Sequence, residues 1–412
     1  MSDITAAQPS GNAFHYPQYV KYLVALLCHG FAAQILVVAI GWQVYDITRD
    51  PWDLGLIGLS QFLPALLLVL VTGLVADRFN RRLILSVCLA IETLCALAFL
   101  IFTLSHPTIV TPMFGILIVL GMARAFFSPA ADALAPNLLP REAIPHGISL
   151  NSMSWQLSNI TGPVMGGLLY GIAGEVAYGT AAALVVCALL AVVLIGKTKQ
   201  VNRLEETTIS TLLAGFRFIK SEPIVLGAIS LDLFAVLLGG TYALMPVYAR
   251  DILQVDELGL GFLRAAPGVG AMVMALWLAK FGIKNHAGRI LFWCVAGFGL
   301  FTVVFGVSTW VPLSIFALML VGAFDMVSVY VRETLMQLWT PDEVRGRVNA
   351  VNRVFIGASN ELGEFRAGAV AAKLGAVTAV VMGGVGTVAV AALWSQMFPT
   401  LRTARKLEGR VA

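Results

Sequence analysis

The sequence predicts an all-α membrane protein with twelve transmembrane helices in two pseudo-symmetric six-helix halves. Three observations support this prediction: the composition, the recurrence of long apolar runs and an internal repeat. Of the 412 residues, 58% are hydrophobic and only 12% are charged, and the mean hydropathy is +0.85. An ordinary soluble domain has about 25% charged residues. The composition therefore excludes a soluble enzyme, a nucleic-acid-binding protein and a disordered scaffold.

Apolar runs long enough to cross a membrane recur along the whole chain. A helix rises 1.5 Å per residue, so about 20 residues cross a hydrocarbon layer of about 30 Å. Cutting the chain at its polar interruptions gives twelve such spans. They are 22–45, 54–75, 83–104, 113–134, 148–172, 178–195, 224–247, 259–279, 290–307, 313–336, 351–372 and 377–398.

Basic residues predict the orientation of the spans. Most of the 27 Lys and Arg residues fall on the side of the membrane that holds both termini, and the opposite loops hold only Arg49, Arg250 and Lys373. The positive-inside rule therefore places both termini in the cytoplasm, as expected for a multi-pass protein of the bacterial inner membrane. We expect an N-terminal tail (1–20), a six-helix bundle (21–197), an amphipathic cytoplasmic linker (198–222), a second bundle (223–398) and a C-terminal tail (399–412).

The two halves repeat one another. An offset of 201 residues aligns spans four and five with spans ten and eleven, and Asp132 falls on Glu333 in this register. Two repeats of this kind place a site near the midplane between them, and rocking about that site gives alternating access. The identical pairs are Gly121 and Gly322, Pro140 and Pro341, Glu142 and Glu343, Asn151 and Asn352, Ser158 and Ser359, Asn159 and Asn360, Gly162 and Gly363, and Gly167 and Gly368.

A charged loop follows the second span. It reads Gly73-Leu74-Val75-Ala76-Asp77-Arg78-Phe79-Asn80-Arg81-Arg82 and resembles the signature of the major facilitator superfamily, with Asn80 in the place of a usual Gly. Asn tolerates a left-handed backbone, so we expect the tight turn to be kept there. The resemblance implies a cytoplasmic gate held by Asp77. The residues expected in this gate are Gly73, Asp77, Arg78, Arg81, Arg82, Asp132, Arg332 and Glu333.

Two readings of these gate residues are open. Asp132 can pair with Arg78, Arg81 or Arg82, and Arg332 and Glu333 are expected to form pairs near the cytoplasmic end. Alternatively, the arginines of the loop only obey the positive-inside rule. That alternative leaves the acid among them unexplained.

Span five carries a second motif, Gly162-Pro163-Val164-Met165-Gly166-Gly167. Proline bends a helix, and glycines allow a neighbouring helix to approach closely. The segment resembles the core of the antiporter motif of the same superfamily, which implies export. Plain packing of small residues is the alternative. Together with 53–82, 124–167 and 246–251, it makes the chain similar to the branch of the superfamily that contains enterobactin, macrolide and drug exporters.

Charged residues inside the spans are candidates for proton coupling. A charge at a helix centre costs about 2.5 to 3.5 kcal/mol on insertion scales, so it usually faces a cavity or a partner. The repeat places Asp325 opposite Arg124, where proton-coupled antiporters of the resembled family carry an Arg. One helical turn separates Glu361 from Glu364, so repulsion favours proton binding by at least one of them. The candidates are Arg124, Asp232, Asp325, Glu361 and Glu364, and structural pairing is the alternative for each.

Spans one, four, seven and ten line the cavity in the resembled family. The candidate substrate contacts are therefore Gln34, Tyr242, Met245, Met326 and Tyr330, with Trp42, Tyr45 and Tyr248 near the outer ends either contacts or interface-belt residues. We expect a monomer that binds a small-molecule substrate, protons and membrane lipid, with no nucleic acid, cofactor or metal. The sequence contains no phosphate-binding loop, nucleophile elbow or clustered metal ligands, so it predicts no enzyme.

These features predict a secondary active transporter that exports amphipathic small molecules of siderophore, macrolide or drug type in exchange for protons. The first alternative is an importer or facilitator of a polar metabolite with the same fold. The second is a membrane sensor or lipid-handling protein that transports nothing. Such a protein would show no substrate-dependent proton flux.

Overall fold

The computed structural model describes residues 11–196, 209–283 and 285–403, without the side chains of residues 69, 70, 74, 76, 77 and 209–212. This part of the chain is helical and holds no strand. Its long helices are α1 (Pro17–Thr48), α2 (Pro51–Arg78), α3 (Arg81–Leu104), α4 (Thr111–Leu134), α5 (Ile144–Ile172), α6 (Gly174–Val193), α7 (Ile209–Ser221), α8 (Pro223–Gly239), α10 (Glu257–Phe281), α11 (Ala287–Val307), α12 (Val311–Trp339), α13 (Asp342–Leu374) and α14 (Ala376–Met397).

Short helical pieces complete the described chain. They are η1 (Ala13–His15), η2 (Ala135–Leu138), η3 (Arg141–Ala143), η4 (Tyr242–Leu244), α9 (Met245–Val247), η5 (Tyr248–Ile252) and α15 (Pro399–Thr403). The predicted tails and linker are described only in part, because residues 1–10, 198–208 and 404–412 lie outside the described residues.

Several helices begin at a side chain that caps them. The side chains of Asp50 and Asp256 accept hydrogen bonds from backbone N–H groups in the first turns of α2 and α10, at Trp52 and Gly259. These bonds satisfy donors that have no partner within the helix. Asn80 caps α3 in the same way, with φ −63° and ψ 112°. The expected left-handed turn at Asn80 is therefore wrong, because a capping residue takes an extended backbone.

In the described part of the chain, ten helices are long and apolar enough to cross a membrane. Two further helices, α5 and α13, have 29 and 33 residues, which is long enough, but they carry more polar side chains. They correspond to the predicted spans 148–172 and 351–372. The chain is a multi-pass membrane protein.

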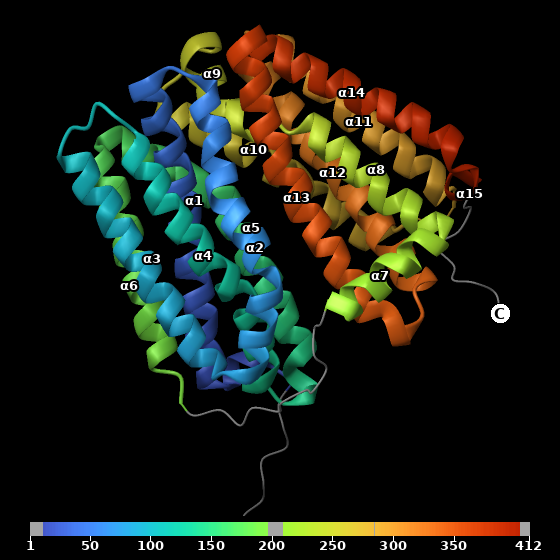
Figure 1. The fold of residues 1–412 in the computed structure, drawn as a ribbon, viewed down its shortest axis with the longest axis horizontal. Helices are drawn as coiled ribbons and strands as arrows, with labels where there is room; N and C mark the ends of the chain where they lie inside the picture. Colours follow the sequence, from blue (N-terminus) through green and yellow to red (C-terminus); the bar gives the residue numbers. More distant parts are fainter. Residues whose placement is uncertain (1–10, 197–208, 284, 404–412) are drawn as a thin grey trace, which may run out of the picture.

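The helices form two groups with the same internal packing pattern (Figure 1). In the first group α1 packs on α5 and α6, α2 on α4, and α3 on α4 and α6. In the second, α8 packs on α13 and α14, α10 on α12, and α11 on α12 and α14. The groups meet where α5 packs on α10 and α2 packs on α13.

Close backbone contacts follow the sequence repeat. A Cβ atom added at Gly121 of α4 would collide with the backbone of Gln61 on α2. A Cβ atom added at Gly322 of α12 would likewise collide with the backbone of Pro267 on α10. Glycine is required at both places because only its backbone fits so close to a neighbour. The offset of 201 residues therefore relates equivalent helix contacts.

The predicted span 224–247 is interrupted. Helix α8 ends at Gly239, and the chain continues through Gly240 and Thr241 into η4, α9 and the π-helical turn η5. The Arg366 guanidinium of α13 donates hydrogen bonds to the carbonyls of Leu237 and Leu238 at the end of α8. A cation at a helix C-terminus satisfies these carbonyls and interacts favourably with the helix dipole.

Helix α7 packs beside α13, at the lower right in Figure 1. Ile219 is buried in a cluster with Val348 and Val351 of α13, and Phe216 contacts Phe355 edge to face, with ring centroids 6.5 Å apart. Below, the end of the bundle near α9 is called the α9 end and the opposite end the α7 end.

Candidate functional site

Two carboxyl groups and two guanidinium groups gather where the helix groups meet. Arg124 of α4 donates a hydrogen bond from Nη1 to Gln61 Oε1 of α2, at 3.0 Å. It also interacts electrostatically with Glu361 of α13. A Cβ atom added at Gly58 of α2 would lie 2.5 Å from Glu361 Oε2, so this glycine leaves room for the carboxyl group. The predicted residues Arg124 and Glu361 therefore meet across the two groups.

The second guanidinium of the cluster is Arg264 on α10. It interacts electrostatically with Glu364, and its Nη2 donates to the carbonyl of Tyr242 at 3.2 Å. Among the described residues, Arg124 Nε and Nη2 and Arg264 Nε are buried without a hydrogen-bond partner. A buried donor without a partner costs about 1 to 3 kcal/mol. These N–H groups can therefore donate hydrogen bonds to a bound group or to water.

The break after α8 brings Tyr242 to this cluster. A Cβ atom added at Gly240 would lie 3.1 Å from the backbone of Gly363, so the chain turns directly against α13 beside Glu364. Tyr242 interacts electrostatically with both Glu364 and Asp325, and 39% of its surface is exposed. Non-helical backbone at membrane depth is tolerated where it lines a cavity or is buried in protein.

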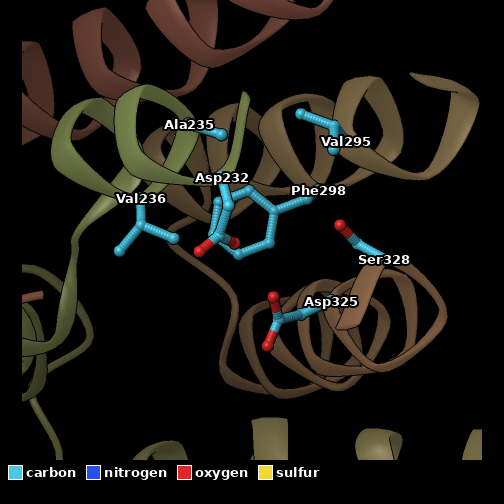
Figure 2. Close-up of a pocket in the computed structure, with 7 residues that line it drawn as sticks. All are labelled: Asp232, Ala235, Val236, Val295, Phe298, Asp325 and Ser328. Atoms are coloured by element: carbon cyan, nitrogen blue, oxygen red, sulfur yellow. The ribbon is translucent and has the colours of Figure 1, made fainter. Parts of the chain in front are cut away.

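Asp232 and Asp325 line one small pocket in the second group. Figure 2 shows both carboxyl groups extending toward the same space between α8 and α12, with the Phe298 ring beside Asp232. Asp232 forms a buried ion pair with Arg332 of α12. The structure thus brings Arg124 to Glu361, whereas Asp325 lies in this separate pocket and Arg332 pairs inside the second group.

The α9 end is closed by polar contacts between the groups. Asp251 of η5 accepts hydrogen bonds from Tyr45 Oη and from Arg49 of α1, the latter at 3.5 Å. Arg250 forms an ion pair with Asp46 at 2.6 Å and lies 5.3 Å from the centre of the Trp42 ring. These contacts form the α9-end lock, whose charged members Asp46, Arg49, Arg250 and Asp251 were absent from the predicted site. The available signal was the match of Val44-Tyr45 with Val247-Tyr248, because the charged residues follow these equivalent positions in spans one and seven.

The α7 end has a different arrangement of the predicted gate residues. Asp132 contacts Arg353 of α13 at 3.0 Å, and the side chains are 64% and 76% exposed. Arg81 donates to the carbonyl of Ala133 at 3.0 Å, which caps the end of α4. Arg82 donates to the carbonyl of Val193 and so caps α6.

Other gate candidates have local surroundings. Glu333 accepts a hydrogen bond from Asn352 at 3.2 Å, inside the second group, whereas Asp132 contacts the opposite group. Gly73 lies on α2 and Arg78 forms its last residue. The side chain of Asp77, the centre of the predicted gate, lies outside the described part of the structure.

The antiporter-like motif of α5 lies at two helix contacts. Cβ atoms added at Gly162 and Gly166 would press on Gln34 and Ile35 of α1. One added at Gly167 would collide with the backbone of Glu257 on α10. Pro163 lies inside the helix, and its carbonyl would be 2.6 Å from a Cβ atom on Gly261. The motif therefore packs α5 tightly against helices of both groups.

The predicted substrate contacts are placed in different surroundings. Gln34 donates a hydrogen bond to Asn159 of α5, at the interface of α1 and α5. Met245 is fully buried, while Met326 and Tyr330 are partly buried against the core of the second group. Of these residues, Tyr242 has the direct link to the charged cluster.

One buried pair was missed by the sequence reasoning. His29 of α1 lies 3.1 Å from Glu92 of α3, and Glu92 also interacts electrostatically with Arg124. The available signal was that His29 and Glu92 are both ionisable residues inside predicted spans. They are 63 positions apart in the sequence, and nothing between them indicates that they meet.

Comparison with known proteins identifies the family. Residues 19–407 match the family described as transmembrane secretion effector. The chain belongs to this family. It is a secondary transporter of the major facilitator superfamily, and its relatives are transporters, not enzymes.

The chain also resembles curated relatives along most of its length. The enterobactin exporter EntS of Shigella boydii serotype 18 is 26% identical over 405 residues, covering 96% of this chain and 95% of the relative. The EntS protein of Escherichia coli O81 gives the same identity and coverage. That of Shigella dysenteriae serotype 1 is 27% identical over 345 residues, 82% of this chain and 81% of the relative.

Solved transporter structures share the fold. A bacterial homolog of the human lysosomal transporter Spinster, in an inward-facing and occupied conformation, has a TM-score of 0.75 and 14% identity. The match covers 94% of this chain and 98% of that chain. The D-xylose-proton symporter has a TM-score of 0.71 and 13% identity, with 94% and 99% covered.

Proposed function

We propose that the chain is a proton-coupled exporter of amphipathic small molecules of siderophore type in the bacterial inner membrane. The name of the curated relatives, enterobactin exporter, supports the substrate class and the direction. The meeting of Arg124, Glu361, Glu364 and Arg264 between the helix groups supports the coupling. This charged cluster is the single observation that carries the proposal.

The proposed architecture has twelve transmembrane helices in two six-helix halves, 21–197 and 223–398. Helices α5 and α13 cross the membrane despite their polarity, because their polar faces meet the other half rather than lipid. The repeated packing pattern and the paired glycine contacts support this division. Both termini then lie in the cytoplasm by the positive-inside rule, so the α9 end is periplasmic and the α7 end cytoplasmic.

Transport then proceeds by alternating access. The α9-end lock closes the periplasmic side in this conformation. At the cytoplasmic side the exposed Asp132–Arg353 pair joins the two groups, and this weaker contact opens to admit substrate. Substrate enters from the cytoplasm and reaches the cluster at the interface of the halves. The signature arginines and Asp77 form the gate that closes this side when the periplasmic side opens.

Proton coupling requires that one carboxyl group exchange a proton as substrate arrives. Glu361 and Glu364 repel one another when both are charged, and Arg124 and Arg264 offset that repulsion. Substrate that displaces a guanidinium or occupies the space beside a carboxyl group changes the proton affinity of the pair. Asp232 and Asp325 are a second candidate group of carboxyls, linked to the first through Tyr242.

The experiment uses inside-out vesicles with an imposed acid interior and a pH-sensitive dye. Catecholate siderophores, macrolides and lipophilic cations are added one at a time. We expect one class to dissipate the gradient, and Arg124→Ala to abolish this dissipation. Arg141→Ala, an exposed arginine outside the helix interface, is the matched control and should leave the rate unchanged. An unchanged rate in Arg124→Ala, or silence across the panel with folded protein, would contradict the proposal.

A further inference from the structure

A buried ion pair joins α1 and α3 outside the cluster described above. His29 Nε2 lies 3.1 and 3.3 Å from the two carboxylate oxygens of Glu92. The Glu92 side chain is 2% exposed and that of His29 is 16% exposed. The imidazole stacks on the Phe127 ring of α4, with centroids 4.0 Å apart and planes 19° from parallel. The pair is therefore held from three helices, and of its two side chains only that of His29 is partly exposed.

This pair can hold a variable number of protons. With one proton it is a neutral His⁺–Glu⁻ pair, and loss of that proton leaves a buried carboxylate beside a neutral imidazole. A buried carboxylate without a cation is unfavourable, so the second state requires compensation from another charged group. Histidine is the side chain that ordinarily changes charge near neutral pH.

The groups around the pair identify that compensating charge. Arg124 of α4 interacts electrostatically with Glu92. The thiols of Cys88 and Cys95 lie one helical turn to either side of Glu92 on α3 and interact with it. Cys28 of α1 interacts electrostatically with Cys187 of α6, and α5 contributes the uncharged Ser158 beside Gly30. Arg124 is therefore the permanently charged cation among these described neighbours.

Arg124 also interacts with Glu361 of the other helix group. One guanidinium thus serves a carboxyl group in each group of helices. Its Nη1 atom is held by Gln61 at 3.0 Å, while its Nε and Nη2 atoms are buried without hydrogen-bond partners among the described residues, so these two groups are available to either carboxyl group. The guanidinium is equipped to move between Glu92 and Glu361.

We propose that His29 and Glu92 form a second proton-binding site, coupled through Arg124 to Glu361. The inference rests on the proposed function, in which Glu361 carries a coupling proton. When the His29 imidazolium gives its proton to water, Arg124 moves toward Glu92 and away from Glu361. Glu361, left without its cation, then binds a proton from water. One proton is released at α1 and one is bound at α13, so the charge of the interior is conserved.

The test titrates the purified full-length protein without substrate. Histidine labelled with ¹⁵N reports the protonation of each imidazole by NMR, and His29→Gln identifies the His29 signal. Replacing Glu361 by Gln frees Arg124 for Glu92, so we expect the His29 midpoint to move to lower pH by about one unit. The separate variant Glu361→Asp keeps the carboxylate charge, so its His29 midpoint should equal that of the wild-type protein. His286, exposed and far along the chain, is the internal control.

A matched control and a double variant separate coupling from general damage. Glu343→Gln removes an exposed carboxyl group from the same helix and should leave the His29 midpoint unchanged. In an Arg124→Gln background, Glu361→Gln should no longer move the midpoint. A His29 that does not titrate between pH 5 and 9, or a midpoint insensitive to Glu361→Gln, overturns the inference. Because the titration needs no substrate, its outcome is independent of whether the vesicle assay supports export.

Discussion

Buried arginines in this transporter differ in what they contact. Arg332 pairs with the Asp232 carboxylate, and Arg366 donates to backbone carbonyls at the end of α8. Arg124, Arg264 and Arg332 each retain a buried N–H group without a hydrogen-bond partner among the described residues. The Arg332 and Arg366 contacts both lie within the second helix group. Arg124 interacts electrostatically with Glu361 of the second group, and a Cβ atom added at Gly41 of the first group would lie 3.7 Å from Arg264 Nη2. In the proposed mechanism Arg124 and Arg264 change partners during transport.

The Asp232–Arg332 pair provides a test of this distinction. Removing one member leaves a buried charge unpaired, which costs about 3 to 5 kcal/mol. We expect Asp232→Asn to lower the thermal unfolding temperature markedly, and Asp232→Asn with Arg332→Met to recover much of the loss. The measurement is thermal unfolding of the detergent-solubilised protein.

The control for this pair is the exposed Asp342–Arg345 pair of α13, with a distance of 2.5 Å. Exposed pairs are worth about 0.2 to 1 kcal/mol, so Asp342→Asn should have little effect. Equal losses in the two single variants would argue against a structural role for the buried pair.

The sequence predicted which charged residues inside the spans matter, but not which side chains they contact. Arg124, Glu361 and Glu364 were identified because charges inside apolar spans are costly and need a reason. Their pairing was not readable, since the repeat pointed to Asp325 opposite Arg124 and the structure brings Glu361 there. His29 and Glu92 were missed as a pair because nothing local in the chain relates α1 to α3. Partner choice depends on helix rotation, which periodicity does not fix when a helix is apolar on all sides.

Among the helices, glycine determines how closely neighbours approach. Gly121 and Gly322 bring α2 to α4 and α10 to α12 at repeat-related places. Without water to drive association, such contacts depend on van der Waals packing of small residues. The repeat is therefore conserved in backbone contacts even where side chains have diverged.

Two glycines on the same helix test this explanation. Ala is better than Gly in a helix by about 0.8 to 1 kcal/mol, so a Gly→Ala change in open space should be neutral or stabilising. Gly115 of α4 has nothing within 4 Å of an added Cβ atom, whereas Gly121 would collide with the Gln61 backbone. We expect Gly121→Ala to lower the unfolding temperature of the purified protein and Gly115→Ala to preserve it. Similar behaviour of the two variants would mean that α2 shifts freely and that the contact is not required.

The sequence predicted helices well where the apolar run was continuous. It predicted α10 and α11 within a few residues of their observed bounds. It did not predict the break in span 224–247, although Gly239 and Gly240 marked the place. An adjacent glycine pair also occurs in continuous membrane helices, so the pair alone does not predict a break. The break also needs Arg366, which satisfies the carbonyls that are left without helical partners. That residue lies on a distant segment of the chain.

Across the whole molecule, the two ends of the helix interface are unequal. The α9-end lock joins Tyr45, Asp46 and Arg49 to Arg250 and Asp251. The α7 end has the exposed Asp132–Arg353 pair among the described residues. The α9-end lock holds the two groups together at the α9 end.

Arg250→Ala tests the lock. The change removes both the ion pair with Asp46 and the contact with the Trp42 ring, worth about 1 kcal/mol together, which corresponds to about a fivefold change in population. Spin labels are placed at the exposed residues Ser105 and Trp310, one in each group, and double electron–electron resonance measures the distance between them at this end. We expect the population with the longer distance to grow in Arg250→Ala but not in Arg141→Ala. An unchanged distance distribution would exclude the lock as the closing element.

Glycines lie at both interfaces between the helix groups. Gly55 of α2 lies against Gly368 of α13, and Cβ atoms added at Gly261 of α10 and Gly167 of α5 would collide with the backbone of Pro163 and of Glu257. Backbone atoms have no side-chain rotamers that must change when one helix slides past another. These glycine contacts therefore offer little resistance to relative movement of the two groups. In the proposed rocking motion, the resistance then comes from charged contacts between the groups, both at the ends and between Arg124 and Glu361. Salt screens exposed charges, so the ionic strength on each side of the membrane changes how strongly the contacts at that end resist rocking. The turnover rate therefore depends on the ionic strength of both sides.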